Sequence, residues 1–152
     1  MLKNKIEIIS RKTAERLISD GFPDNVAVIS FFDPKSNRTP KNYTPIDYSN
    51  VCDRVFYVAV HDIDIEILPD YGLTFDTYFP EADALAEFIK ESISQGFDII
   101  CQCEYGQSRS AACAAAIKEF YDKSGIEIFA DYRYYPNQLI FNKLLNALKS
   151  KG

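Results

Sequence analysis

Apolar residues along this chain fall into short, nearly continuous runs, a pattern typical of β-strands that are buried on both faces of a sheet. Strands are predicted over Ile6 to Ser10, Asn25 to Phe31, Val55 to Val60 and Asp98 to Cys103. The segment from Asp33 to Asn50 contains Pro34, Pro40 and Pro45 and has no apolar period. We expect a long surface loop there, and loops of this length in compact domains are often functional.

Four other segments have helical character. Amphipathic helices are predicted over Lys12 to Ile18, Pro80 to Gln95 and Asn137 to Leu148, and a helix with a face of small residues over Arg109 to Tyr121. Gly21 and Gly96 stand where the first two of these helices should end, and Pro80 suits a first helical turn. Strands that alternate with helices predict an α/β fold, with a central, mostly parallel sheet flanked by helices.

Composition and charge narrow the class of protein. The chain has 152 residues, of which 47% are hydrophobic, and this suits one domain over residues 1–152. Seventeen Lys and Arg against 22 Asp and Glu give a net charge of -5, which argues against nucleic acid or an anionic membrane as a partner. The sequence lacks the apolar runs of a spanning helix and of a signal peptide, so the expected compartment is the cytoplasm. The four cysteines should then be reduced.

The segment Cys103-Glu-Tyr-Gly-Gln-Ser-Arg-Ser110 joins a predicted buried strand to a predicted helix. In open α/β sheets, ligands bind at the carboxyl ends of strands. A strand-loop-helix turn also points successive backbone N–H groups into one concavity at a helix N-terminus, which favours an anion. Gly106 permits the close turn, and the planar guanidinium of Arg109 matches two oxygens of a phosphate. The segment therefore predicts a phosphate site.

A sulfur stands at the start of this phosphate site. A helix N-terminus and a nearby arginine favour the thiolate form of a cysteine, so Cys103 is a candidate in-line nucleophile that forms a phosphocysteine. Ser110 can donate its hydroxyl to the sulfur when the thiolate leaves. Zinc ligation by Cys101, Cys103 and Cys113 is disfavoured, because the spacing is not that of a structural zinc site and the nucleophile would be consumed. No metal or cofactor is expected, and Cys101 and Cys113 should lie in the core.

This loop resembles the His-Cys-x5-Arg-Ser/Thr signature of the cysteine-dependent protein tyrosine phosphatases, in particular their compact dual-specificity branch. The resemblance implies that Cys103 is the nucleophile, that Arg109 binds phosphate and that Ser110 assists departure of the thiolate. It also implies that backbone amides cradle the phosphate, contributed by Glu104, Tyr105, Gly106, Gln107, Ser108 and Arg109. The order and spacing of elements are similar over roughly residues 25 to 148.

The family's general acid is an aspartate on a loop that follows the upstream strand. Matching Val60 to the end of that strand puts Asp64 at the acid position. Asp62 is the alternative, two residues earlier and on the same side of an extended chain. Asp70 and Asp76 lie further into the loop and are less favoured. The resemblance thus implies an acid in this loop and favours Asp64.

Two neighbours of the loop bear on its geometry. Gln102 stands where the family usually has His, and its amide can still bond a backbone carbonyl, so impaired tuning and not loss of activity is expected. Asn137 is similar to a family residue that hydrogen-bonds the phosphate loop. The cluster from Asp131 to Tyr135 is expected to pack against the protein, with a substrate groove as the alternative.

The sequence therefore predicts a metal-independent phosphatase that acts on phosphotyrosine proteins or peptides, with phosphoserine and phosphothreonine as further substrates. Two alternatives stay open, a phosphoinositide phosphatase and a phosphopeptide-binding module without turnover. The loop residues Glu104, Tyr105 and Gln107 include no lysine, whereas phosphoinositide-specific relatives place lysines there. Both Cys103 and Asp64 are present, which favours an enzyme over the binding module.

Overall fold

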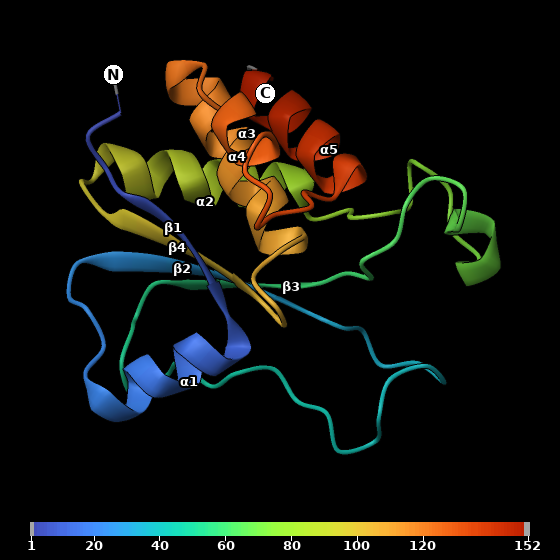
Figure 1. Ribbon diagram of the computed structural model, residues 1–152, viewed down its shortest axis with the longest axis horizontal. Coiled ribbons are helices and arrows are strands. Elements are labelled where there is room, and N and C mark those ends of the chain that lie inside the picture. The colour runs from blue at the N-terminus through green and yellow to red at the C-terminus, as the bar shows by residue number, and fades with distance from the viewer. Residues whose placement is uncertain (1, 151–152) are drawn as a thin grey trace.

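A four-stranded sheet forms the centre of the computed structural model, which describes residues 2–150 (Figure 1). Its strands are β1 (Ile6–Ser10), β2 (Val26–Phe32), β3 (Val55–Ala59) and β4 (Asp98–Cys103). They lie in the order β1-β4-β2-β3, and every pair is parallel. The expected α/β architecture is confirmed. Because β4 lies between β1 and β2, the loop that follows it emerges near the middle of the sheet edge.

Helices cover both faces of the sheet. The helices of the structure are α1 (Arg11–Asp20), η1 (Leu68–Tyr71), α2 (Ala82–Ser94), α3 (Arg109–Asp122), α4 (Ile126–Phe129) and α5 (Gln138–Lys149), and all of them except η1 lie on one side of the sheet or the other (Figure 1). Helix α1 lies on one face, and α2, α3, α4 and α5 gather on the other (Figure 1). Five alanines of α3 are fully buried, and α3 contacts β1, β4 and α5. The small side chains of α3 let this helix lie deep between the sheet and α5.

Each face of the sheet has its own core, because strands β2 and β4 are buried on both sides. The larger core contains Phe31, Tyr78 and Phe79, and the smaller one, under α1, contains Tyr48. These four aromatic rings are among the largest fully buried side chains. Tyr48 belongs to the long loop after β2, so part of that loop covers the sheet and is not a purely external segment.

The structure departs from the sequence prediction at several element boundaries. Strand β3 lies at the edge of the sheet, so it is only partly buried, and Tyr57 remains 40% exposed. Helix α2 begins at Ala82, which places Pro80 just before the helix and not in its first turn. The helices η1 and α4 were not predicted, because four residues are too few to show an apolar period. Within residues 2–150, no helix is long and apolar enough to cross a membrane.

Candidate active site

The loop over residues 104–108 leaves β4 at Cys103 and enters α3 at Arg109. Both of these end residues are buried, with 3% and 5% of their surface exposed. The Sγ atom of Cys103 lies 3.0 Å from the Oγ atom of Ser110, which is fully buried in the first turn of α3. The structure thus brings Cys103, Arg109 and Ser110 together at the N-terminus of α3, with the Ser110 hydroxyl within hydrogen-bond distance of the sulfur.

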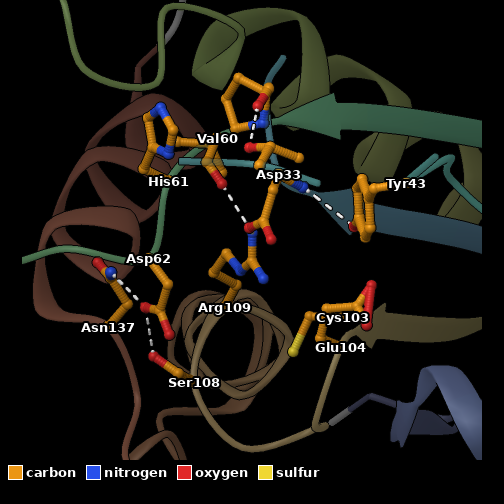
Figure 2. Close-up of polar contacts among 12 residues, drawn as sticks. Asp33, Tyr43, Val60, His61, Asp62, Cys103, Glu104, Ser108, Arg109 and Asn137 are labelled. Carbon is orange, nitrogen blue, oxygen red and sulfur yellow. Dashed lines mark hydrogen bonds and ion pairs between the residues drawn. The ribbon is translucent and has the colours of Figure 1, made fainter. Parts of the chain in front are cut away.

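Arg109 is held along one edge of its guanidinium. Its Nη1 atom donates to the Oδ1 atom of Asp33 at 2.7 Å and to the carbonyl oxygen of Val60 at 2.8 Å (Figure 2). Burial by itself lowers the pKa of Arg109, but the charges of Asp33, Cys103 and Asp62 and the hydrogen bond to Asp33 together raise it above its ordinary value. The guanidinium therefore stays charged. Its Nε atom is buried and, within the described chain, has no hydrogen-bond partner.

An unpaired buried N–H on a charged group is costly unless a ligand accepts from it. A phosphate above Cys103 would supply oxygen acceptors for Arg109 and for the loop amides together. Asp33 was not identified from the sequence as a site residue. The position of Asp33 directly after β2 could have indicated a role in the site, because parallel strands end at the same edge of the sheet and ligands bind there.

Gly106 lies where the loop meets the junction of β1 and α1. Its φ of 68° is in the left-handed region, and an added Cβ would lie 2.8 Å from the backbone carbon of Ile9 and from the nitrogen of Ser10. The same junction fixes the start of the loop, because the backbone nitrogen of Arg11 donates to the carbonyl oxygen of Glu104 at 3.0 Å. The side chains of Arg11 and Glu104 also form an ion pair at 3.2 Å. The loop over residues 104–108 is therefore held in place by contacts with the junction of β1 and α1.

Substitution Gly106→Ala should lower both stability and activity. The left-handed backbone costs about 1–2 kcal/mol for any residue with a Cβ, and the clash with rigid backbone adds about 1–3 kcal/mol more. Gly72→Ala is a matched control, because Gly72 also has a φ of 68° but an added Cβ would meet nothing within 4 Å. Urea unfolding and the rate of hydrolysis of p-nitrophenyl phosphate are measured for both variants. Equal stability and equal turnover in the two variants would contradict this account.

Gln102 forms the hydrogen bond to a backbone carbonyl that the sequence predicts. Its Nε2 atom donates to the carbonyl oxygen of Cys103 at 3.1 Å, and the residue is 2% exposed. Its Oε1 atom accepts from the hydroxyls of Ser30 at 2.6 Å and of Tyr48 at 2.7 Å. Burial raises the pKa of Tyr48, so this phenol stays protonated as a donor. These bonds orient Gln102 beneath the loop and fix the backbone at Cys103.

The two candidate acids lie in different surroundings. The Oδ1 atom of Asp62 accepts from the Oγ atom of Ser108 at 2.7 Å and from the Nδ2 atom of Asn137 at 2.9 Å (Figure 2). Asp62 also lines a cavity of about 260 Å³ together with Cys103 and Arg109. Asp64 is exposed and, within residues 2–150, forms no hydrogen bond with the phosphate loop, lining a neighbouring cavity instead. The acid that the sequence favoured is therefore not the one next to the loop.

Asn137 connects two loops. One is the loop after β3 that contains Asp62 and Asp64, here called the acid loop, and the other is the loop over residues 104–108, here called the phosphate loop. Its backbone nitrogen donates to the carbonyl oxygen of Ser108 at 3.2 Å, and its Nδ2 atom donates to Asp62 and to the carbonyl oxygen of Ile63. Its Oδ1 atom accepts from the backbone nitrogen of Ile140 at 2.9 Å and so caps α5. One side chain thereby fixes three segments, which makes Asn137 a positioning residue for Asp62.

Tyrosines after α4 border the site. The backbone nitrogen of Tyr135 donates to the carbonyl oxygen of Gln107 at 2.7 Å, and its ring is 70% exposed. Tyr135 lines the cavity above Cys103, and Tyr132 is 88% exposed. The expected packing role is wrong for these two residues. The reason is that the segment before α5 is held by backbone bonds to the phosphate loop, which leaves its rings at the surface.

Cys101 and Cys113 do not line the cavity that contains Cys103. Cys101 and Cys113 are fully buried in the larger core, and burial raises the pKa of the Cys113 thiol, with a contribution from Cys101. His61 packs against the ring of Tyr71 at 4.6 Å between centroids. Burial lowers the pKa of His61. Within residues 2–150, no group of three or more His, Cys, Asp or Glu is arranged to hold a metal ion.

Solved structures share this arrangement of strands and helices. The PTP-2 phosphatase of Cydia pomonella aligns with a TM-score of 0.57 and 13% identity, over 96% of this chain and 87% of its own. Human DUSP28 aligns with a TM-score of 0.54 and 16% identity, over 95% of this chain and 91% of its own. This chain has the fold of the cysteine-based tyrosine and dual-specificity phosphatases.

A third structure with this phosphatase fold is PTPMT1 in complex with PI(5)P. It aligns with a TM-score of 0.54 and 14% identity, over 97% of this chain and 92% of its own. No protein-family model matches the chain, and no curated protein matches it at a significant level. At these low identities the structural likeness concerns the phosphatase fold, and the chemistry rests on the residues of the loop.

Proposed function

We propose that this protein is a phosphatase that hydrolyses phosphotyrosine in proteins or peptides through a phosphocysteine on Cys103. The observation that carries the proposal is that Arg109 lines the cavity that contains Cys103, while its buried Nε atom has no hydrogen-bond partner among residues 2–150. A tetrahedral phosphate placed there would accept from Arg109 and from the amides of the loop, while the sulfur lies beneath it. These interactions strengthen as charge develops on the transferred group.

The first step forms a sulfur–phosphorus bond and breaks the bond between phosphorus and the ester oxygen. The leaving oxygen takes the proton of Asp62, so the alcohol or phenol departs neutral. Support for Asp62 comes from its hydrogen bond to Ser108 and its place in the cavity that contains Cys103. We therefore assign the acid to Asp62 in place of Asp64, the residue that the sequence favoured.

The second step breaks the sulfur–phosphorus bond. A water oxygen attacks phosphorus, Asp62 takes the water proton, and inorganic phosphate and the Cys103 thiolate result. The hydroxyl of Ser110, 3.0 Å from the sulfur, donates to the thiolate as it leaves. Each group returns to its starting protonation state, so the cycle needs no metal and no cofactor.

Phosphotyrosine is favoured as the substrate by the residues around the loop. Tyr105 and Tyr135 line the cavity above Cys103 and are 81% and 70% exposed, so they can flank an aromatic ring. A phosphoinositide is the second candidate, because PTPMT1 in complex with PI(5)P shares the fold. Of the described residues that line the cavity, Arg109 is the one cation and Asp62 is an anion, and this gives additional phosphates of a head group little to bind.

Hydrolysis of p-nitrophenyl phosphate in EDTA tests the proposal directly. We expect turnover without added metal, together with a phosphoryl adduct on Cys103 that mass spectrometry detects after acid quenching. A phosphotyrosine peptide and soluble PI(5)P are compared as substrates, and the peptide should have the higher kcat/KM. Absence of turnover on all three compounds would overturn the proposal.

A further inference from the structure

A second cavity of about 530 Å³ adjoins the cavity above Cys103 and shares Asp62, Ser108 and Tyr135 with it. We call this second cavity the flank groove. Because the two cavities share one wall, a substrate whose phosphate lies on Cys103 would continue into the flank groove. The groove is therefore in position to contact residues next to the phosphorylated one.

One wall of the flank groove is the acid loop. Asp64 and Glu66 are exposed there, and Ile65 between them is 59% exposed. The lining of the groove also includes the exposed rings of Phe75 and Tyr135. The groove thus combines carboxylates with apolar and aromatic surface, the combination that a long basic side chain fills with its charged head and its aliphatic stem.

Among residues 2–150, no lysine or arginine lines the flank groove. Lys143 approaches one of its residues, but the Nζ atom of Lys143 donates to the carbonyl oxygen of Phe75 at 2.7 Å. Desolvation lowers the pKa of Lys143, while the charges of Asp76, Asp83 and Glu81 oppose that change. The negative charge of Asp64 and Glu66 is therefore open to a cation from a partner.

We propose that the flank groove binds a Lys or Arg that lies within about three residues of the phosphorylated residue in a peptide substrate. This inference rests on the proposed function and names its substrate class. An extended chain advances about 3.3 Å per residue, so one to three residues carry a side chain from the first cavity into the second. The phosphate meets the cationic Arg109 and the flanking cation meets Glu66, so the two sites select opposite charges.

The same charges disfavour acidic substrates. A peptide with Glu at the flanking position would place a carboxylate beside Asp64 and Glu66, and like charges in contact oppose binding. A polyphosphorylated lipid head group would meet the same wall. The groove therefore points to a basic phosphopeptide and away from a phosphoinositide.

Glu66→Lys tests the flank groove without altering either candidate acid. The substrates are phosphotyrosine peptides that differ only by Lys, Gln or Glu at each of the three positions on either side. For the wild-type protein, we expect the Lys peptide to exceed the Glu peptide in kcat/KM by about 5–10-fold at one or more positions. Glu66→Lys should abolish or reverse that ratio, and NaCl at about 0.5 M should reduce it.

Asp24→Lys is the matched control, because it makes the same change of charge at an exposed residue before β2, at the opposite edge of the sheet. The control should keep the wild-type preference. The inference is overturned if the wild type shows no preference for Lys, if Glu66→Lys keeps the preference, or if soluble PI(5)P has a higher kcat/KM than every peptide.

Turnover of p-nitrophenyl phosphate by the wild type separates this inference from the proposed function, since that compound has no flanking residues. Turnover without a flank preference contradicts the flank groove alone. Absence of turnover on every substrate contradicts both.

Discussion

Cys103→Ser should lower the turnover of p-nitrophenyl phosphate by about 10³-fold or more. A serine hydroxyl fills the same space but is protonated at neutral pH, so it is a poor nucleophile. The change should leave the fold intact, because the side chain keeps its size and Ser110 remains within hydrogen-bond reach. Initial rates of the purified variant measure the loss, and thermal unfolding shows that the protein is folded.

Cys52→Ser is the control for this substitution. The Cys52 thiol lies before β3, at the opposite edge of the sheet, and donates to the carbonyl oxygens of Val26 and Arg54 at 3.5 Å. Its replacement should keep turnover near the wild-type value. A Cys103→Ser variant that retained wild-type turnover would exclude Cys103 as the nucleophile.

The serine variant should also keep its affinity for a phosphopeptide. Arg109 and the loop amides, which hold the phosphate, are unchanged by the substitution, so binding and chemistry become separable. Titration with a phosphotyrosine peptide should give a dissociation constant close to the KM of the wild type where KM reflects binding. Loss of affinity together with turnover would instead indicate that the loop had rearranged.

Asp62→Asn should lower kcat by about 10²–10⁴-fold, the contribution typical of a positioned general acid. The amide can accept from Ser108 as Asp62 does, but it cannot give a proton to the leaving oxygen. The loss should be larger with phosphotyrosine than with p-nitrophenyl phosphate, because the phenol of tyrosine is the poorer leaving group. Steady-state rates on both substrates measure this difference.

Asp64→Asn is the comparison that decides between the two aspartates. Asp64 is exposed and lines the flank groove, so its replacement should leave the leaving-group dependence of kcat unchanged. Equal losses on both substrates for Asp62→Asn would contradict an acid role for that residue. A large loss for Asp64→Asn that grows with the poorer leaving group would transfer the role to Asp64.

The proposed recognition of phosphate by a chain of net charge -5 would depend on short-range contacts. Asp33 fixes Arg109 along one edge, and the Nε atom on the other edge remains for a ligand. The flank groove is negative beside this point. A single phosphate next to a basic residue fits both features, whereas a uniformly acidic partner fits neither.

Features that depend only on residues adjacent in the chain could be predicted from the sequence. Strands β1 and β4 were predicted with the bounds that the structure has, because apolar runs report burial along one continuous segment. The segment from Cys103 to Ser110 is also continuous, so its turn, its helix N-terminus and its arrangement of sulfur and guanidinium follow from local geometry. The bonding of Gln102 to the adjacent carbonyl was predictable for the same reason.

The α/β architecture and the loop over residues 104–108 thus follow from contiguous stretches of sequence, whereas the groups that face that loop follow from the tertiary structure. Asp62 reaches Ser108 across 46 positions, and Asp33 reaches Arg109 across 76. These contacts depend on strand order, on register and on the direction in which each loop leaves the sheet edge. Asp62 and Asp64 are two residues apart, and which of them lies next to the loop depends on the direction in which the chain runs after β3. Sequence periodicity does not encode that direction once the strand has ended.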